Sequence, residues 1–182
     1  MQVSKAARRY ATAMLQLAKE RDEVEDIMND MDLIRNTVSG SRELMLLLRS
    51  PIVKSSDKEQ VLKKLFGERV TEPMRLFLDL LVKKDREDLI GQIAEAFIAL
   101  YNDYKGIIVV EVASAQDLSD KQQADLQKSL ENRTGKTVRM NLKVDESLKG
   151  GLTVRIEDTV IDGSVKNKLQ ELQALLHNTS VN

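Results

Sequence analysis

The residues of this chain that come nearest to a known chemical motif are Thr134-Gly135-Lys136-Thr137. This order matches the end of a phosphate-binding loop, in which backbone amides and a lysine hold the phosphates of a nucleotide. The motif also needs a glycine five residues before Gly135, and Leu130 stands there. In addition, such a loop follows a strand and begins a helix, whereas this pattern ends a helix and begins a strand. We therefore interpret these residues as a helix-to-strand turn and expect no nucleotide site.

The remaining titratable residues do not form a pattern that indicates catalysis. His177 is the single histidine and the chain has no cysteine, so a metal site with nitrogen and sulfur ligands is not expected. General acid–base catalysis needs carboxyl groups in a partly buried cleft. The acidic residues Asp145-Glu146, Glu157-Asp158 and Asp162 lie in expected turns, where they act as caps or face solvent. We expect no catalytic residue, no cofactor and no metal.

The charge balance argues against a nucleic-acid partner. The 182 residues include 28 Lys+Arg against 29 Asp+Glu, and both halves of the chain are close to neutral. A general nucleic-acid binder needs a basic field, which neither half supplies. The longest aliphatic run, Leu44–Leu48, is far too short to span a membrane, and no apolar segment of a secretory signal opens the sequence. We expect a soluble chain.

Residues 4–105 have a helical hydrophobic period, which predicts six antiparallel helices with short connections packed as a bundle. Gly40 is expected to end the second helix in the left-handed conformation. Ser56-Asp57-Lys58-Glu59 has the pattern of a capping box for the fourth, and Asp85 can cap the sixth. The third is expected to stop before Pro51.

At Lys105-Gly106 the helical period changes to the alternation of strands, and we place a domain boundary there, between residues 1–105 and 106–182. The second part predicts strand–helix–strand–strand–helix, a small α/β domain with its helices on one face of the sheet. Residues 159–161 briefly resume the alternation. The expected fold is mainly α with a small α+β part.

Two helices of the first domain have more apolar surface than one core requires. The first helix has a wide apolar arc, and the fifth has apolar residues on two sides. If these helices lie side by side, a groove between them would accept an amphipathic helix. Alternatively, all of the residues concerned are ordinary core residues of the bundle. The candidate groove residues are Ala6, Tyr10, Ala13, Leu17, Leu76 and Leu80.

The segment 150–169 combines a Gly150-Gly151 turn, a strand, an acidic turn and the run Val160-Ile161-Asp162-Gly163-Ser164 before a helix with a leucine stripe. It resembles the C-terminal signature of the ATP synthase delta subunit family, whose mitochondrial members are called the oligomycin-sensitivity-conferring protein. Residues 7–13, Ala-Arg-Arg-Tyr-Ala-Thr-Ala, resemble the N-terminal opening of the same family. Glu157 departs from the family, in which a glycine more often precedes the aspartate.

The resemblance implies a non-catalytic stator component that links the catalytic head of the synthase to its peripheral stalk and resists rotor torque. In the family, the six-helix domain sits on the head and holds an N-terminal helix of an α subunit between its first and fifth helices. Tyr10 and Ala13 lie in the matching motif, while Leu76 and Leu80 follow by helix order.

The C-terminal domain is implied to join the end of the b-subunit stalk. That contact would fall on a structural turn formed by Gly150, Gly151, Asp162, Gly163 and Ser164, or on the last helix. The implied location is the cytoplasmic face of a bacterial inner membrane, reached only through the complex. We interpret the glycines as structural, since they give backbone freedom at tight turns.

Two other functions remain open on the sequence. One is a general helical adaptor that binds another amphipathic peptide in the same groove, and the co-purifying partner would distinguish it. The other is a small nucleotide-dependent enzyme centred on Gly135-Lys136-Thr137. Tight ATP binding that is lost on Lys136→Ala would indicate the enzyme.

Overall fold

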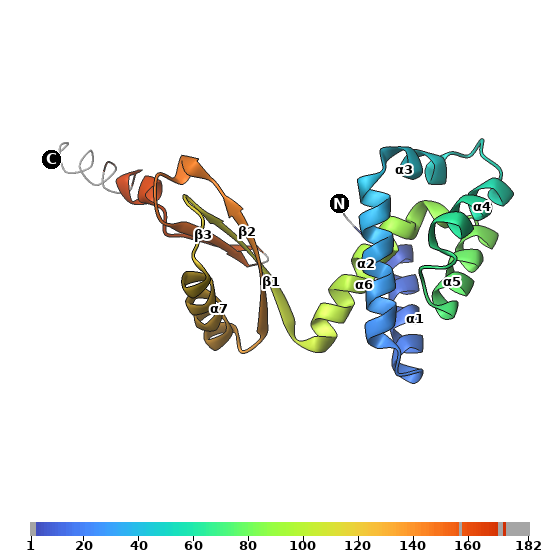
Figure 1. Ribbon diagram of the computed structural model, residues 1–182, viewed down its shortest axis with the longest axis horizontal. Coiled ribbons are helices and arrows are strands. Elements are labelled where there is room, and N and C mark those ends of the chain that lie inside the picture. The colour runs from blue at the N-terminus through green and yellow to red at the C-terminus, as the bar shows by residue number, and fades with distance from the viewer. Residues whose placement is uncertain (1–2, 157, 171–172, 174–182) are drawn as a thin grey trace. The chain divides into compact units, whose positions relative to one another are not determined.

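The computed structural model describes residues 3–156, 158–170 and 173. The chain divides into two compact units, Met1–Tyr104 and Lys105–Asn182 (Figure 1). The first is helical, and the second contains a four-stranded sheet with a helix. The predicted fold class is confirmed at this level, as a mainly helical chain with a small α/β part. Over the described residues, no helix is long and apolar enough to cross a membrane.

Each of the six α-helices in the first unit contributes buried side chains, and the largest of these include Phe66 and Phe97. The first helix is capped by Ser4, whose Oγ accepts a hydrogen bond from the Ala7 N–H at 3.2 Å. The elements are α1 (Lys5–Glu20), α2 (Val24–Gly40), α3 (Arg42–Arg49), α4 (Ser55–Phe66), α5 (Glu72–Lys83), a 3-10 turn at Glu87–Leu89 and α6 (Ile90–Lys105).

Three predicted helix ends differ from the structure. Gly40 is the last residue of α2 and is not left-handed. The fourth helix begins at Ser55, one residue before the predicted capping box, and the Ser56 hydroxyl bonds to the Asp57 carboxylate instead. Asp85 adopts a positive φ of 51° and precedes the 3-10 turn rather than capping α6. Each difference lies at a connection between two helices.

A buried ion pair joins α4 to the turn that precedes α6. The Lys58 Nζ donates to Glu87 Oε1 at 2.6 Å and to the Leu48 carbonyl oxygen, at the end of α3, at 2.9 Å. Lys58 and Glu87 are both only 5% exposed. One ammonium group therefore connects three elements that are far apart in the sequence.

In the second unit the strand order is β2-β1-β3-β4, and β1 pairs with β2 in parallel and with β3 in antiparallel orientation. The brief alternation at residues 159–161 forms a fourth strand, antiparallel to β3, which the predicted order of elements did not include. The elements are β1 (Ile107–Ser114), α7 (Asp120–Thr134), β2 (Thr137–Val144), β3 (Leu152–Ile156) and β4 (Thr159–Asp162).

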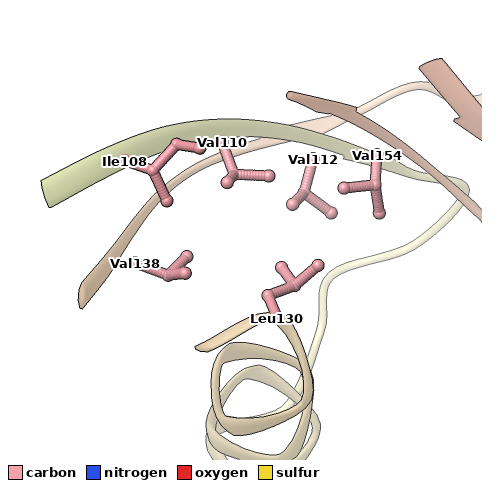
Figure 2. Close-up of a cluster of buried hydrophobic side chains, with 6 residues drawn as sticks. All are labelled: Ile108, Val110, Val112, Leu130, Val138 and Val154. Atoms are coloured by element: carbon pink, nitrogen blue, oxygen red, sulfur yellow. The ribbon is translucent and has the colours of Figure 1, made fainter. Parts of the chain in front are cut away.

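The core of this unit lies between the sheet and α7. Figure 2 shows Leu130 of α7 pointing toward valine and isoleucine side chains of the strands. The predicted helix-to-strand turn is confirmed, because α7 ends at Thr134, Gly135 is left-handed with a φ of 66°, and β2 begins at Thr137. The core residues are Ile108, Val110, Val112, Leu130, Val138 and Val154.

Candidate partner-binding surfaces

The apolar arc of α1 divides into a buried face and a partly exposed strip. Ala7, Ala11 and Met14 belong to the buried face. Beside it, Ala13 is exposed, and three further residues of the predicted groove are half-buried. Their spacing of three or four residues places all four on one side of the helix. The α1 residues of this strip are Ala6, Tyr10, Ala13 and Leu17.

On α5, the two candidate residues face away from the core. Leu76 is 61% exposed and Leu80 is 43% exposed, whereas Met74 and Leu78 of the same helix are buried. Leu76 and Leu80 are one turn apart, so they form a continuous apolar surface. Such exposure of two large aliphatic side chains on one helix turn is typical of a surface that a partner covers.

The rings of Tyr10 and Phe77 bring α1 and α5 together. Their centroids are 6.2 Å apart with an interplanar angle of 66°, which is an edge-to-face contact. We define the α1/α5 strip as Ala6, Tyr10, Ala13, Leu17, Leu76 and Leu80. The alternative that all six are core residues is wrong, because Ala13, Leu76 and Leu80 are exposed.

In the C-terminal unit, the glycine pair lies directly against the turn that follows β4. The Val165 N–H donates to the Gly150 carbonyl oxygen at 2.9 Å, and the Gly163 N–H donates to that of Leu152 at 3.0 Å. Gly151 has a φ of 76°, and a Cβ there would lie 2.4 Å from the Gly163 carbonyl oxygen. This close approach requires glycine at position 151.

The Asp162-Gly163-Ser164 turn begins the next helix, at residues 165–170. Ser164 is 1% exposed, its Oγ accepts from the Asn167 N–H at 3.1 Å, and its N–H donates to Asp162 Oδ1 at 2.8 Å. Hydrogen bonding from Ser164, with a smaller contribution from the charge of Lys166, lowers the pKa of Asp162 below its ordinary value. An ionised capping carboxylate of this kind stabilises the turn and is poorly suited to proton transfer.

Asp145 has a similar capping role. Its carboxylate accepts a hydrogen bond from the Ser147 N–H at 3.0 Å, and hydrogen bonding from Ser147 lowers its pKa. Two of the acidic residues considered for acid–base chemistry are therefore caps, of which Asp145 is half-buried and Asp162 is exposed. Glu157 and His177 lie outside the described residues.

Exposed apolar side chains flank the turn, with Ile161 before it in β4 and Val165 and Leu169 after it. Ile161 is 44% exposed, Val165 is 41% exposed and Leu169 is 52% exposed. We call these three residues the C-terminal apolar patch. The predicted leucine stripe of this helix continues to Leu172 and Leu176, which lie outside the described residues.

Comparison with known proteins identifies the family. The family model for the ATP synthase delta (OSCP) subunit matches residues 6–176, which is nearly the whole chain. The chain belongs to this family. The range includes both stretches that resembled the family in the sequence, as well as all residues of the α1/α5 strip.

Similar delta subunits cover almost the full length of the chain. It is 43% identical over 171 residues to the ATP synthase subunit delta of Chlorobium phaeovibrioides, and the match covers 94% of each chain. The subunit delta of Chlorobaculum parvum is 40% identical with the same coverage. A chain in the cryo-EM structure of the Toxoplasma gondii mitochondrial ATP synthase hexamer has a TM-score of 0.71 at 29% identity, covering 95% of this chain and 98% of that chain.

Membership of the delta family establishes the role at the level of the complex. The chain is a non-catalytic component of the peripheral stalk of an F-type ATP synthase. This agrees with the function that the sequence resemblance implied.

The sequence alone did not predict the Lys58–Glu87 pair of this delta-family chain. A signal was present, because Lys58 lies one and two turns before Leu62 and Phe66, both of which are buried. A lysine on an apolar stripe indicates either a snorkelling side chain or a buried partner. The partner is 29 residues away, so the local sequence could not identify it.

Proposed function

We propose that the two units of this delta-family chain bind different parts of the synthase. The α1/α5 strip binds an N-terminal helix of an α subunit in the catalytic head. The C-terminal unit binds the end of the b-subunit stalk, so the chain holds the head stationary against rotor torque. The complex lies on the cytoplasmic face of a bacterial inner membrane, and the chain reaches the membrane only through it.

The exposure of Leu76 and Leu80 beside α1 carries the first part of the proposal. Burying apolar surface stabilises a complex by about 25 cal/mol per Å², and two exposed leucines supply such surface where it can meet a helix. An amphipathic helix binds through apolar residues that are three and four positions apart. The residues of the α1/α5 strip have the same spacing on each of its two helices. We further propose that α1–α6 form a single six-helix bundle that holds the strip rigid.

The C-terminal apolar patch supports the second part. Its three residues flank a turn that Gly151, Asp162 and Ser164 hold in one conformation. The turn itself has a structural role, and the exposed Val165 and Leu169 next to it offer the apolar surface for a stalk helix.

The decisive experiment measures binding of a synthetic peptide, taken from the start of the α subunit of the same synthase, to the full chain. Leu76→Asp and Ala13→Asp place a charge in the apolar contact and are expected to weaken binding by tenfold or more, about 1.4 kcal/mol. Thr12→Asp is the matched control, because Thr12 is an exposed residue on another side of α1. Isothermal titration calorimetry gives the affinities, and circular dichroism monitors folding.

Unchanged affinity of both strip variants, with intact circular dichroism, would refute the assignment of the α1/α5 strip. Tyr10→Asp is a less suitable variant, because it also removes the contact with Phe77 and is expected to destabilise the helical unit. An apolar strip does not identify the helix that it binds, so purification from the native cell is a second test: synthase head subunits must accompany the chain.

A further inference from the structure

The strand β2 is an outer strand of the described sheet. Its hydrogen bonds to β1 show which of its residues direct their N–H and C=O groups away from the sheet. The Thr137 N–H donates to the Gly106 carbonyl oxygen at 3.0 Å, and the Asp145 N–H donates to that of Ser114 at 2.8 Å. In a parallel ladder, the N–H and C=O groups of alternate residues point to the same side. The odd-numbered residues of β2 therefore bond to β1, and the even-numbered residues point outward.

The first outward-facing residue is already bonded to α7. Gln127 Nε2 donates to the Val138 carbonyl oxygen at 3.1 Å, and the Val138 N–H donates to Glu131 Oε1 at 3.1 Å. Gln127 Nε2 also donates to Glu131 Oε1 at 3.2 Å, which holds the two side chains together. Among the described residues, the side chains of α7 thus hydrogen-bond to the outer edge of β2 at Val138.

Beyond this cap, Met140, Leu142 and Val144 present the remaining outward N–H and C=O groups. Within the part of the chain that the structure describes, β2 pairs only with β1. Leu142 and Val144 are 44% and 46% exposed, although they lie on the face of the sheet that carries the core. An uncapped edge flanked by exposed apolar side chains is a template for an added strand.

The opposite face of this edge is basic. Arg139 and Lys143 are exposed there, on either side of Asn141. The carboxylate of Glu111 lies on the neighbouring strand β1. Its Cα partner on the other side, in β3, is Arg155. Arg139 and Lys143 are therefore the charges that a strand added to β2 would meet first.

We propose that the β2 edge from Met140 to Val144 binds an extended segment of another polypeptide as an additional strand. The segment alternates apolar residues, which face Leu142 and Val144, with acidic residues, which face Arg139 and Lys143. Cross-strand pairs of opposite charge and of apolar residues both stabilise an added strand. This site is separate from the α1/α5 strip and does not depend on which helix that strip binds.

The test uses the full chain and a short capped peptide in which valine and glutamate alternate. Binding is expected to slow hydrogen exchange of the Leu142 and Val144 amides by about tenfold or more, measured by NMR, because these N–H groups gain hydrogen bonds. The matched control peptide has lysine in place of glutamate and is expected to leave exchange unchanged. A second control, N-methylated at every residue, keeps the side chains but donates no ladder hydrogen bond in either strand direction and is expected not to bind.

Variants of the chain provide an independent check. Leu142→Pro removes one outward N–H, and proline is accepted in edge strands where the N–H faces solvent. It is expected to abolish the protection of Val144 by the peptide, whereas Leu142→Val keeps it. Equal protection by the lysine or the N-methylated peptide would overturn the proposal, as would an absence of protection by the valine–glutamate peptide. Concentration-dependent protection without peptide would show that a second copy occupies the edge and would also overturn it.

Discussion

Lys58 occupies a helical position where an apolar residue would be expected, since it shares a stripe with the buried Leu62 and Phe66. Its charge is stable there only because Glu87 and the Leu48 carbonyl oxygen accept hydrogen bonds from it. A buried charge left without its partner is strongly destabilising, while replacing both charges with apolar groups can be nearly neutral. The pair therefore favours the docking of the turn at Glu87–Leu89 against α4, whatever its net contribution to stability.

Removing one charge of this pair gives the first prediction. Lys58→Met is expected to lower the free energy of unfolding by about 3–5 kcal/mol, because it leaves the Glu87 carboxylate buried and unpaired. Chemical denaturation of the full chain, followed by circular dichroism, measures the change. Adding Glu87→Leu is expected to restore most of the loss.

The matched control is Lys63→Met, in the same helix. Lys63 pairs with Glu59 at 2.5 Å, but its side chain is 58% exposed and the interaction is screened by solvent. This change is expected to cost far less than Lys58→Met. Equal costs would contradict the role of burial.

At the scale of elements, the residues of the C-terminal signature allow two backbone segments to approach closely, the one before β3 and the one after β4. Gly151, Gly163 and the Ser164 cap bring the start of β3 against the end of β4 and fix the direction of the helix at residues 165–170. The helix in turn carries Val165 and Leu169. A family signature can thus consist of residues that position a binding surface without forming it.

Gly151→Ala tests this role. The added Cβ meets the Gly163 carbonyl oxygen at 2.4 Å, and the φ of 76° is unfavourable for alanine, so we expect a loss of about 1–3 kcal/mol in the stability of the C-terminal unit. Gly135→Ala is the control, since Gly135 has a similar φ of 66° but nothing within 4 Å of an added Cβ. Thermal unfolding of both variants separates steric contact from backbone preference, and an equal loss in both would exclude a steric role.

At the scale of the whole molecule, the proposed contacts with the head and the stalk belong to different compact units. The α1/α5 strip lies within residues 1–104, and the C-terminal apolar patch lies within residues 105–182. A stator needs both contacts at once. Binding at one unit therefore must not depend on the surface of the other.

This separation predicts independent loss of the two contacts. Leu76→Asp is expected to abolish capture of the α-subunit peptide and to leave capture of a fragment from the stalk end of the b subunit unchanged. Leu169→Asp is expected to do the reverse. Pull-down of each fragment with both variants measures this. A single variant that abolishes both captures while remaining folded would contradict the assignment of one partner to each unit.

Several features could be predicted from the sequence because they depend on local chemistry. Hydrophobic period located the six helices of the first unit, and the change of period located the strands. The turn at Gly135 followed from its place between a helical and an alternating pattern. The outward direction of Leu76 and Leu80 followed from the helical wheel, since Met74 and Leu78 take the core side of α5.

Other features depended on contacts between distant segments. The end of α2 and the start of α4 differed from prediction, because a helix terminus responds to the neighbouring connection as well as to its own residues. In β2, Val138, Leu142 and Val144 belong to the same alternating set and lie on the same face. Of these three only Val138 is buried, because α7 packs over that end of the strand.

The sequence by itself therefore determined the family and the coarse class of fold, since periodicity and motif spacing record local geometry. The binding role of the α1/α5 strip stays a prediction from the same patterns. The tertiary structure alone decided that Lys58 pairs with Glu87, that Tyr10 contacts Phe77 and that, among the described residues, no strand pairs with the outer edge of β2. These depend on which segments meet in space, and no local pattern of side chains specifies a neighbour that is 29 or more residues away.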